Sequence, residues 1–323
     1  MKSGLKLIIF GSSLQYKNHS RPLYNTLHKI VDVELLENDY VPRSKRNNYF
    51  ITFGYGDYIK LLGYNIPGDR IIYAEHGVCE FYWEDETKVP VSGWGSITFS
   101  EVDKPLIHLA PNQRACDIFS RSHRSVVTGV YETDWIKDWK FNRNKVPIVC
   151  LSSHWNQRGN VYTSSYFDHY FNKIRTAVCK RLGWELVLHG HPRNSGKLKY
   201  RAYSENLRWI KDFKEVVETC DIYICDNSSS IFSFASSHKP VILLNPPNVT
   251  MDTTPSFNFR FWEHADIGIH INFNDPIDII EDKLYNIEDR GNQVNRMIDN
   301  VLANFGRSCE VASEAILNAV VSR

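Results

Sequence analysis

The chain has 323 residues, a length that suits two α/β domains better than one small core. Hydrophobic residues make up 42% of it and charged residues 23%, a globular balance that excludes a disordered chain. Because 38 Lys and Arg are balanced by 37 Asp and Glu, the net charge excludes a general attraction to nucleic acid or membranes. It does not exclude a local basic groove, since net charge averages over all faces of the protein.

Short apolar segments alternate with helical stretches through the first half of the chain. Residues 6–10 predict a strand, and a helix is predicted at residues 21–30. Further strands are predicted at residues 31–36, 48–53, 70–74, 96–100 and 125–128. Short apolar strands between helices are typical of a parallel sheet that is covered on both faces.

A polar stretch at residues 138–147 separates this half from a second one with the same alternation. Strands are predicted there at residues 148–151, 184–188, 206–210, 221–225 and 240–244, and helices at residues 213–219, 276–304 and 308–321. The predicted fold class is therefore α/β, with two Rossmann-like, doubly wound domains.

These patterns predict an N-terminal Rossmann-like acceptor domain over residues 1–143 and a C-terminal Rossmann-like domain for a nucleotide donor over residues 144–305. Residues 306–323 predict a C-terminal helix, which we expect to cross back to the N-terminal domain. In doubly wound sheets, ligands bind beyond the carboxyl ends of the strands. The residues that directly follow predicted strands are therefore the candidates for a site.

The seven cysteines are scattered and odd in number, and no C-x-x-C occurs. This excludes a disulfide framework and a zinc site of the usual spacing, and favours a reducing compartment. Residues 5–10 are too short for the apolar part of a signal peptide, and no apolar run approaches the roughly 20 residues of a membrane span. We expect a soluble, cytoplasmic, unprocessed protein.

The strongest local signal is a serine triplet, Ser228, Ser229 and Ser230, which follows the predicted strand 221–225 and precedes a helix. Serine hydroxyls and the N–H groups of a first helical turn form an anion site that the helix dipole favours. A pyrophosphate would fit such a site. Plain helix capping is the alternative interpretation.

Two histidines and an arginine follow the predicted strand 184–188. His189 and His191 alternate, so they face opposite ways if the strand continues, and we favour His191 because Pro192 fixes the turn after it. Arg193 can bind phosphate oxygens in a bidentate manner. A structural histidine is the alternative.

His76 follows the predicted strand 70–74, and Gly77 allows a sharp turn there. A histidine titrates near neutrality, so it can accept a proton from an acceptor hydroxyl. Glu75 is a candidate supporting group, and Glu80 and Glu84 are alternatives.

A further strand closes at Gly129, which we assign to the surroundings of the donor phosphate. Asp134 lies where a helix should begin, as a supporting residue or only as a helix cap. The sequence contains no P-loop, no G-x-S-x-G, no H-E-x-x-H and no D-x-D, so we predict no metal ligands and no cofactor.

In this order, the motifs resemble the CDP-glycerol glycerophosphotransferases of teichoic-acid synthesis and the related capsule polymerases. The resemblance spans about residues 70–245 through short motifs. The matching residues are His76-Gly77; Gly129, Tyr131 and Asp134; Ser153-His154-Trp155-Asn156 with Arg158; His191-Pro192; Asp226 to Phe234; and Lys239-Pro240.

The resemblance implies the GT-B fold, in which two Rossmann-like domains face a central cleft. It implies that His76 is the base and that His191 binds or protonates the donor phosphate. Ser228 and Ser229 would hold the donor pyrophosphate, with Asp226 opening the same motif. The chain departs from the family where Ser233 replaces its second aspartate and where the arginine of its G-Y-P-R motif is missing.

We therefore expect a metal-independent transferase that moves a sugar or a polyol phosphate from a CDP- or UDP-linked donor to an acceptor hydroxyl. The expected partners are the nucleotide-activated donor and an acceptor on a glycan, a polyol phosphate or a modified base in DNA, without integral membrane association. The alternatives are an enzyme of the UDP-N-acetylglucosamine 2-epimerase type and a binding protein with a degenerate site.

Overall fold

The computed structural model describes residues 6–11, 17–37, 40–75, 82–83, 103–120, 123–138, 144–154, 165–245, 247, 257–258, 265–287 and 290–322. The chain forms two compact units. The first consists of Met1–Asp138 together with Ile298–Arg323, and the second of Trp139–Met297. The sequence had put the boundary after residue 143.

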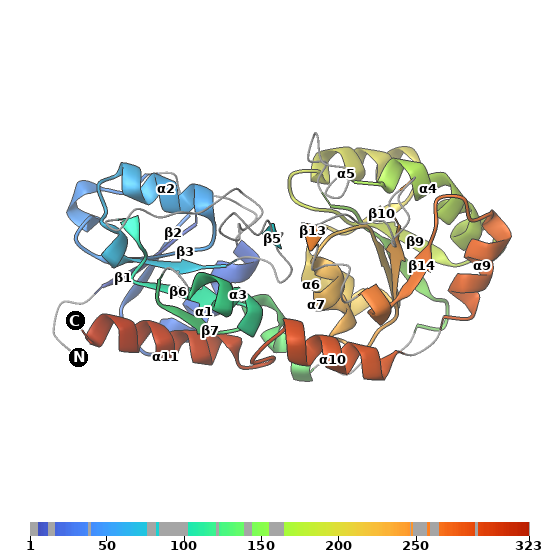
Figure 1. Cartoon of the computed structure of the whole chain (residues 1–323). Helices are drawn as coiled ribbons and strands as arrows, with labels where there is room; N and C mark the ends of the chain where they lie inside the picture. The colour runs from blue at the N-terminus through green and yellow to red at the C-terminus, as the bar shows by residue number, and fades with distance from the viewer. Residues whose placement is uncertain are drawn as a thin grey trace. The chain divides into compact units, whose positions relative to one another are not determined.

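The first unit is built on a six-stranded parallel sheet (Figure 1). Its strands are β1 (Leu7–Phe10), β2 (Val33–Leu36), β3 (Tyr49–Thr52), β4 (Ile71–Ala74), β6 (Ile107–Ala110) and β7 (Ser125–Val127). They lie in the order β2-β1-β3-β4-β6-β7, and Leu7 is aligned with Val33 on one side and with Tyr49 on the other. The chain thus reverses direction across the sheet between β1 and β3.

Helices cover both faces of this sheet, which explains why its strands are buried along most of their length. Figure 1 shows α2 (Tyr55–Gly63) on one side and α11 (Ser308–Val321) on the other. Next to α11 lies α1 (Lys17–Leu27), and α3 (Gln113–Phe119) packs against β6 and β7. Short 3₁₀ helices occupy Arg43–Lys45, Gly68–Arg70 and Tyr131–Asp138.

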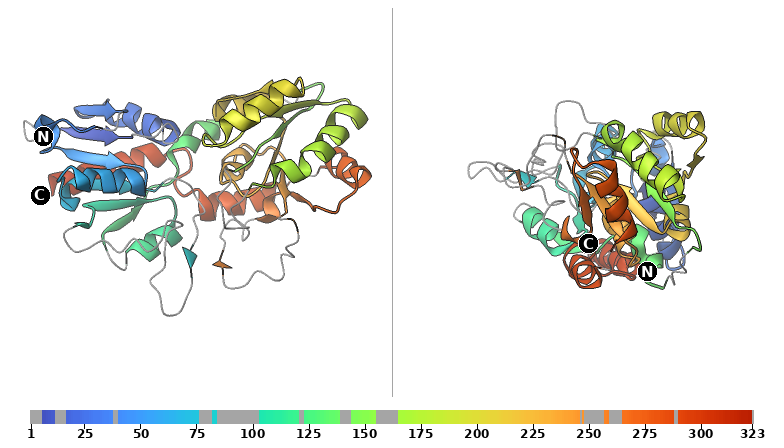
Figure 2. Two further views of the ribbon diagram at one scale, coloured as in Figure 1. Left: turned by 90° about the horizontal axis from the view of Figure 1, so that it is seen from above. Right: turned by 90° about the vertical axis from the view of Figure 1, so that its right-hand side faces the viewer.

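The C-terminal helix α11 belongs to the first unit although it ends the chain. Its residues Ala312 and Ile316 are fully buried in one core with strand residues such as Ile9 and Ile72. Figures 1 and 2 both show α11 running beside the N-terminal sheet. The final helix therefore completes the hydrophobic core that the first strands begin.

The second unit repeats the same architecture with another six-stranded parallel sheet (Figure 2). Its strands are β8 (Ile148–Leu151), β9 (Glu185–Leu188), β10 (Arg208–Trp209), β11 (Ile222–Cys225), β12 (Val241–Leu244) and β14 (Ile269–Ile271). Their order is β10-β9-β8-β11-β12-β14, so the reversal falls between the neighbouring strands β8 and β11. This order is that of a dinucleotide-binding fold.

One face of the second sheet packs against α4 (Phe167–Arg175), α5 (Ser195–Ser204) and α9 (Ile277–Tyr285). A π-helical turn, Thr176–Arg181, continues α4. The other face carries α6 (Phe213–Thr219) and α7 (Ser230–Ala235), where Tyr223 of β11 contacts rings from both helices. The remaining elements are β5 (Tyr82–Trp83), β13 (Phe257–Asn258), the 3₁₀ helix Ala265–Ile267 and α10 (Gly291–Val301).

Most predicted elements are confirmed, and the two-sheet α/β fold is the one that the sequence predicted. The strands β6 and β14 were not predicted, and the predicted strand at residues 96–100 lies outside the described residues. The predicted helix over 276–304 is two helices, α9 and α10, with a break near Asn286. Within the described ranges, no helix has the length and apolar character of a membrane span.

Candidate functional site

The carboxyl ends of β8 and β11 mark the reversal point of the second sheet, where ligands bind in folds of this kind. Backbone hydrogen bonds carry the ladder past the strand ends, from Ser152 N–H to the Ile224 carbonyl at 2.8 Å and from His191 N–H to the Ser153 carbonyl at 3.1 Å. The residues that follow β8, β9 and β11 are therefore held side by side.

The side chain of Asp226, which follows β11, binds the backbone of two other segments of the chain. Its side chain is fully buried, and its carboxylate accepts the backbone N–H of His154 at 2.6 Å and that of Tyr166 at 3.1 Å. Burial raises the pKa of Asp226, and these backbone N–H groups oppose the rise. Asp226 is thus a positioning residue that ties β11 to the chain on either side of residues 155–164.

The two histidines after β9 face different surroundings, as the alternation predicted. His189 is 8% exposed, its Nδ1 lies 3.0 Å from the Ile210 carbonyl, and its ring stacks on Trp209. Burial lowers the pKa of His189, and the bond to Ile210 opposes this. His189 therefore has a structural role, whereas His191 is half-buried at the strand end.

His191 is held in one tautomer by the turn that follows it. The backbone N–H of Arg193 donates to His191 Nδ1 at 3.2 Å, so in the neutral ring the proton resides on Nε2. The N–H of Asn194 donates to the His191 carbonyl at 2.8 Å and closes the turn. The neutral ring of His191 thus carries its proton on Nε2, and the next-but-one residue, Arg193, is exposed.

The serine triplet takes a form that simple capping does not explain. Ser229 occupies the N-cap of α7, but no side-chain hydrogen bond caps the helix, which has only six residues. The hydroxyls of Ser228 and Ser230 lie 2.9 Å apart, and Ser230 also contacts the Tyr223 hydroxyl at 2.8 Å. Burial raises the pKa of Tyr223, so this phenol keeps its proton.

Lys239, from the predicted Lys-Pro pair, lies within the fold and away from solvent. It is 2% exposed, and its ammonium donates to the carbonyls of Val217 and, at 2.8 Å, of Cys220. Burial lowers the pKa of Lys239 to about 8. It satisfies carbonyls at the end of α6, which is a structural role.

His154 is a member of this edge that the sequence did not single out as a site residue. Its ring centroid lies 5.5 Å from that of His191, with the ring planes inclined by 54°. In the resemblance to the glycerophosphotransferases, His154 lies in the matching segment Ser153-His154-Trp155-Asn156, but the family's motif has no histidine at that position. The parallel pairing of β8 with β9 is what brings the two imidazoles together.

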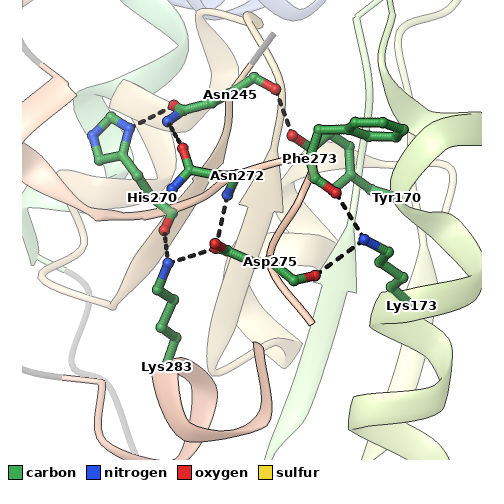
Figure 3. A network of polar contacts seen from close by, with 8 residues as sticks. All are labelled: Tyr170, Lys173, Asn245, His270, Asn272, Phe273, Asp275 and Lys283. Carbon is green, nitrogen blue, oxygen red and sulfur yellow. Dashed lines mark hydrogen bonds and ion pairs between the residues drawn. The ribbon is translucent and has the colours of Figure 1, made fainter. Parts of the chain in front are cut away.

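A further polar network lies where β12 and β14 end (Figure 3). His270 Nδ1 lies 2.7 Å from Asn245 Oδ1 and its Nε2 lies 2.9 Å from the Ala265 carbonyl. The ammonium of Lys283 binds the His270 carbonyl at 2.8 Å and the Asp275 carboxylate at 2.6 Å. This network fixes the strand ends on the α9 side of the unit.

In the first unit, Glu75 follows β4 and is part of a buried chain of polar groups. Its Oε2 lies 3.1 Å from His108 Nε2, and His108 Nδ1 lies 2.8 Å from Ser125 Oγ. Glu75 is 5% exposed and His108 is fully buried. The predicted base, His76, lies outside the described residues, as do Glu80 and Glu84.

Gly129 and Asp134 both contact the segment that leads into α11. Gly129 has φ +96°, and a Cβ atom there would stand 2.0 Å from the Ala303 carbonyl. Asp134 accepts the N–H groups of Ser308 at 2.9 Å and Cys309 at 2.7 Å. The capping interpretation of Asp134 therefore holds, but for α11 instead of the helix that it was expected to begin.

Two other sequence features can be compared with the described part of the chain. The six cysteines in it are all unpaired, and five of them are buried. No cluster of three or more His, Cys, Asp or Glu side chains in the described ranges has the arrangement of a metal site.

No protein-family model matches the chain, and no curated protein matches it. Solved structures do match. The wall teichoic acid polymerase TagF is 13% identical over 100% of this chain and 90% of its own, with a TM-score of 0.65. MnaA of S. aureus, solved with UDP, is 16% identical over 98% of this chain and 96% of its own, with a TM-score of 0.59. The UDP-N-acetylglucosamine 2-epimerase from Rickettsia bellii is 12% identical over 98% of this chain and 96% of its own, with a TM-score of 0.57.

These likenesses establish the fold. The chain has the two-domain α/β arrangement of TagF and the 2-epimerases, the GT-B arrangement that the sequence predicted.

Proposed function

We propose that the chain is a transferase that takes a sugar or a polyol phosphate from a CDP- or UDP-linked donor and passes it to an acceptor hydroxyl. The observation that carries this proposal is that His191 and Arg193 follow β9 and the segment Ser228–Ser230 follows β11, so both stand at the carboxyl edge of the second sheet, on either side of β8. Donors of hydrogen bonds and positive charge at such a point suit a diphosphate.

The solved neighbours support a nucleotide-linked substrate. One TagF structure was soaked with CDPG, and the MnaA structure contains UDP. In the proposed site, His191 Nε2–H donates to a phosphate oxygen and Arg193 neutralises charge on the leaving group. Ser229, half-buried at the start of α7, supplies a hydroxyl and a backbone N–H.

The proposed reaction is a displacement at the donor with inversion of its centre. His76 accepts the acceptor's hydroxyl proton, and the acceptor oxygen forms a bond to the anomeric carbon of a sugar or to the phosphorus of a glycerol phosphate. The bond from that centre to the nucleotide's phosphate oxygen breaks at the same time. The nucleotide keeps the electron pair, and the groups around Ser229 and His191 stabilise its negative charge, which makes a metal unnecessary in this proposal.

The acceptor is a hydroxyl on a glycan, a polyol phosphate or a modified nucleobase. The balanced overall charge favours none of these, since a net charge of +1 attracts a polyanion only weakly. The unpaired cysteines support a reducing, cytoplasmic setting for the proposed reaction.

An epimerase acting on a UDP-sugar is the second candidate, and the likeness to MnaA and to the Rickettsia bellii enzyme favours it. The serine segment argues against it. Phe232, Ser233 and Phe234 stand where an enzyme of that type is expected to carry acidic residues, and all three are buried in α7. We therefore rank transfer above epimerisation.

Thermal-shift measurements with CDP, UDP, GDP and their sugar or glycerol conjugates test the proposal first. A ligand that binds only the folded chain raises its melting temperature. Ser229→Ala should weaken this stabilisation, whereas Ser204→Ala on α5 should leave it unchanged as a matched control.

Product analysis with the binding donor then separates the candidates. A transferase needs an acceptor, whereas an epimerase converts its donor alone. His76→Ala should abolish transfer and leave donor binding nearly intact. Wild-type transfer rates in both His76→Ala and Ser229→Ala would show that the site assignment is wrong.

A further inference from the structure

Tyr223 is a tyrosine of β11 whose hydroxyl reaches the serine triplet from inside the second unit. Its side chain is fully buried, and its ring stacks on that of Phe234 at a centroid separation of 5.0 Å, with the ring of Phe213 edge-on at 6.1 Å. The phenol oxygen lies 2.8 Å from Ser230 Oγ. Because two aromatic neighbours fix the ring, the phenol is held in place beside Ser230.

Four hydroxyl groups form one chain of contacts through this phenol. Tyr223 also bonds the hydroxyl of Ser152, which directly follows β8, and Ser230 Oγ lies 2.9 Å from Ser228 Oγ. The order along the chain is thus Ser152, Tyr223, Ser230 and Ser228. Ser152 is only 2% exposed and Ser228 9%, so both ends of the chain lie largely out of solvent. The chain links the end of β8 to the segment that opens α7.

A count of protons shows that this chain has one donor to spare. Four hydroxyls carry four protons, and the three contacts between them use three. If each group donates to the next in the direction of Ser228, the proton of Ser228 has no acceptor among the four groups. In the opposite direction the spare proton lies on Ser152, beside the thiol of Cys225, which is a weak acceptor. A strong acceptor at Ser228 would therefore select the first direction.

We propose that Tyr223 is a positioning residue of the donor site: its phenol donates to Ser230, Ser230 donates to Ser228, and Ser228 donates to a phosphate oxygen of the nucleotide. This inference rests on the proposed function, because it concerns the same donor site. Burial raises the pKa of Tyr223, so the phenol keeps the proton that it passes along. Hydrogen bonds in a chain polarise one another, and a bond to an ionised acceptor is the strongest place for that effect to appear.

The test is a double-mutant cycle on the affinity of the full chain for CDP and UDP, measured by isothermal titration calorimetry. Tyr223→Phe removes only the hydroxyl and should weaken binding about threefold to tenfold, the effect of one hydrogen bond. In a Ser230→Ala background the chain is already broken, so the same change should weaken binding no further. A purely structural role of the phenol would weaken binding by the same factor in both backgrounds.

Tyr170→Phe is the matched control for the loss of a buried phenol. Tyr170 is also fully buried in the second unit, and its hydroxyl donates to the Asn245 carbonyl at 2.6 Å on the other face of the sheet. Removal of this hydroxyl likewise deletes a buried hydrogen bond, so it should lower the free energy of unfolding. The variant should nevertheless bind CDP and UDP as the wild type does.

The outcomes separate this inference from the proposed function. If the wild type binds neither nucleotide, the proposed function fails and the inference fails with it. If the wild type binds CDP or UDP and Tyr223→Phe binds equally well, or loses the same factor with and without Ser230→Ala, the inference is overturned and the proposed function stands.

A second variant decides the matter if Tyr223→Phe folds poorly. Ser152→Ala removes the other partner of the phenol in the chain, so that Tyr223 can donate only to Ser230 there. This variant should bind CDP and UDP at least as tightly as the wild type does, and clearly weaker binding would overturn the inference.

Discussion

Gly190 separates His189 from His191, and its lack of a side chain allows α5 to approach the end of β9. A Cβ atom at this position would stand 2.1 Å from Leu198 Cδ1 and 3.5 Å from Leu198 Cγ. Leu198 is 1% exposed, so its side chain has little room to retreat. Gly190→Ala should therefore displace either Leu198 or the strand end that carries His191.

The expected cost follows from two opposing effects. Overpacking of a core contact costs about 1–3 kcal/mol. Replacing Gly by Ala restores about 0.4–1 kcal/mol by restricting the unfolded chain. We therefore expect Gly190→Ala to lower the free energy of unfolding by about 0.5–2 kcal/mol. Leu198→Val shortens the obstructing side chain and should cost about 0.5–1.5 kcal/mol on its own.

A double-mutant cycle in urea measures whether the two changes compensate each other. We expect the double variant to lose clearly less stability than the sum of the single variants, and to regain CDP or UDP binding that Gly190→Ala loses. Gly196→Ala on α5 is the control, because a Cβ atom there meets nothing within 4 Å. Strict additivity of Gly190→Ala and Leu198→Val would refute the reasoning.

Other expectations concern the parts that support the site. Asp134→Asn should lower the free energy of unfolding by about 1–2 kcal/mol, because it loosens the cap of α11; chemical denaturation that finds no loss would contradict the capping role. Burial lowers the pKa of His123 from its ordinary 6.5 to about 4, so the unfolded chain binds the proton more readily than the folded one. The free energy of unfolding should therefore decrease as the pH falls from 6.5 to about 4. Melting temperatures across that range should drop less for His123→Gln. Although burial opposes it, the Lys283 ammonium holds the pKa of Asp275 below its usual range, so this pair stabilises the fold above the carboxyl's unfolded pKa and the effect is lost as pH falls. The stability difference between wild type and Lys283→Met should therefore shrink in acid, which urea titrations at several pH values will show.

The sequence predicted those elements whose formation depends on neighbouring residues alone, such as an apolar strand or a capped helix. The strand β11 is an uninterrupted apolar run that ends in polar residues, and α6 begins at a capping aspartate, Asp212. The polar clusters after β9 and β11 were found for the same reason, because parallel strands bury both faces and leave polar side chains at their ends. These features need no knowledge of the strand order.

The strand β6 was missed because a histidine interrupts its apolar run. His108 is nevertheless fully buried, since Glu75 and Ser125 bind its two ring nitrogens. Glu75 directly follows the neighbouring strand β4 and Ser125 begins the neighbouring strand β7, so the sequence around His108 gives no sign of them. A buried polar residue of this kind becomes predictable only once the sheet order is known.

The same limit explains why the contacts of Gly129 and Asp134 with the start of α11 were not predicted. Asp134 and its partner Ser308 lie 174 positions apart, and no local pattern connects them. The positive φ of Gly129 was consistent with a turn that approaches a phosphate, but the neighbour that requires it is the backbone of Ala303. A strand-end glycine therefore needs its tertiary neighbour before it can be assigned to a site.

The buried state of Glu75 bears on which group accepts the acceptor's proton. Its side chain is 1% exposed and its Oε2 lies 3.1 Å from His108 Nε2, so the carboxylate is withdrawn from solvent. A general base must come within hydrogen-bond reach of the proton that it removes. Among the two neighbouring residues that the sequence proposed, Glu75 therefore fits a supporting role, and the proposal assigns proton removal to His76.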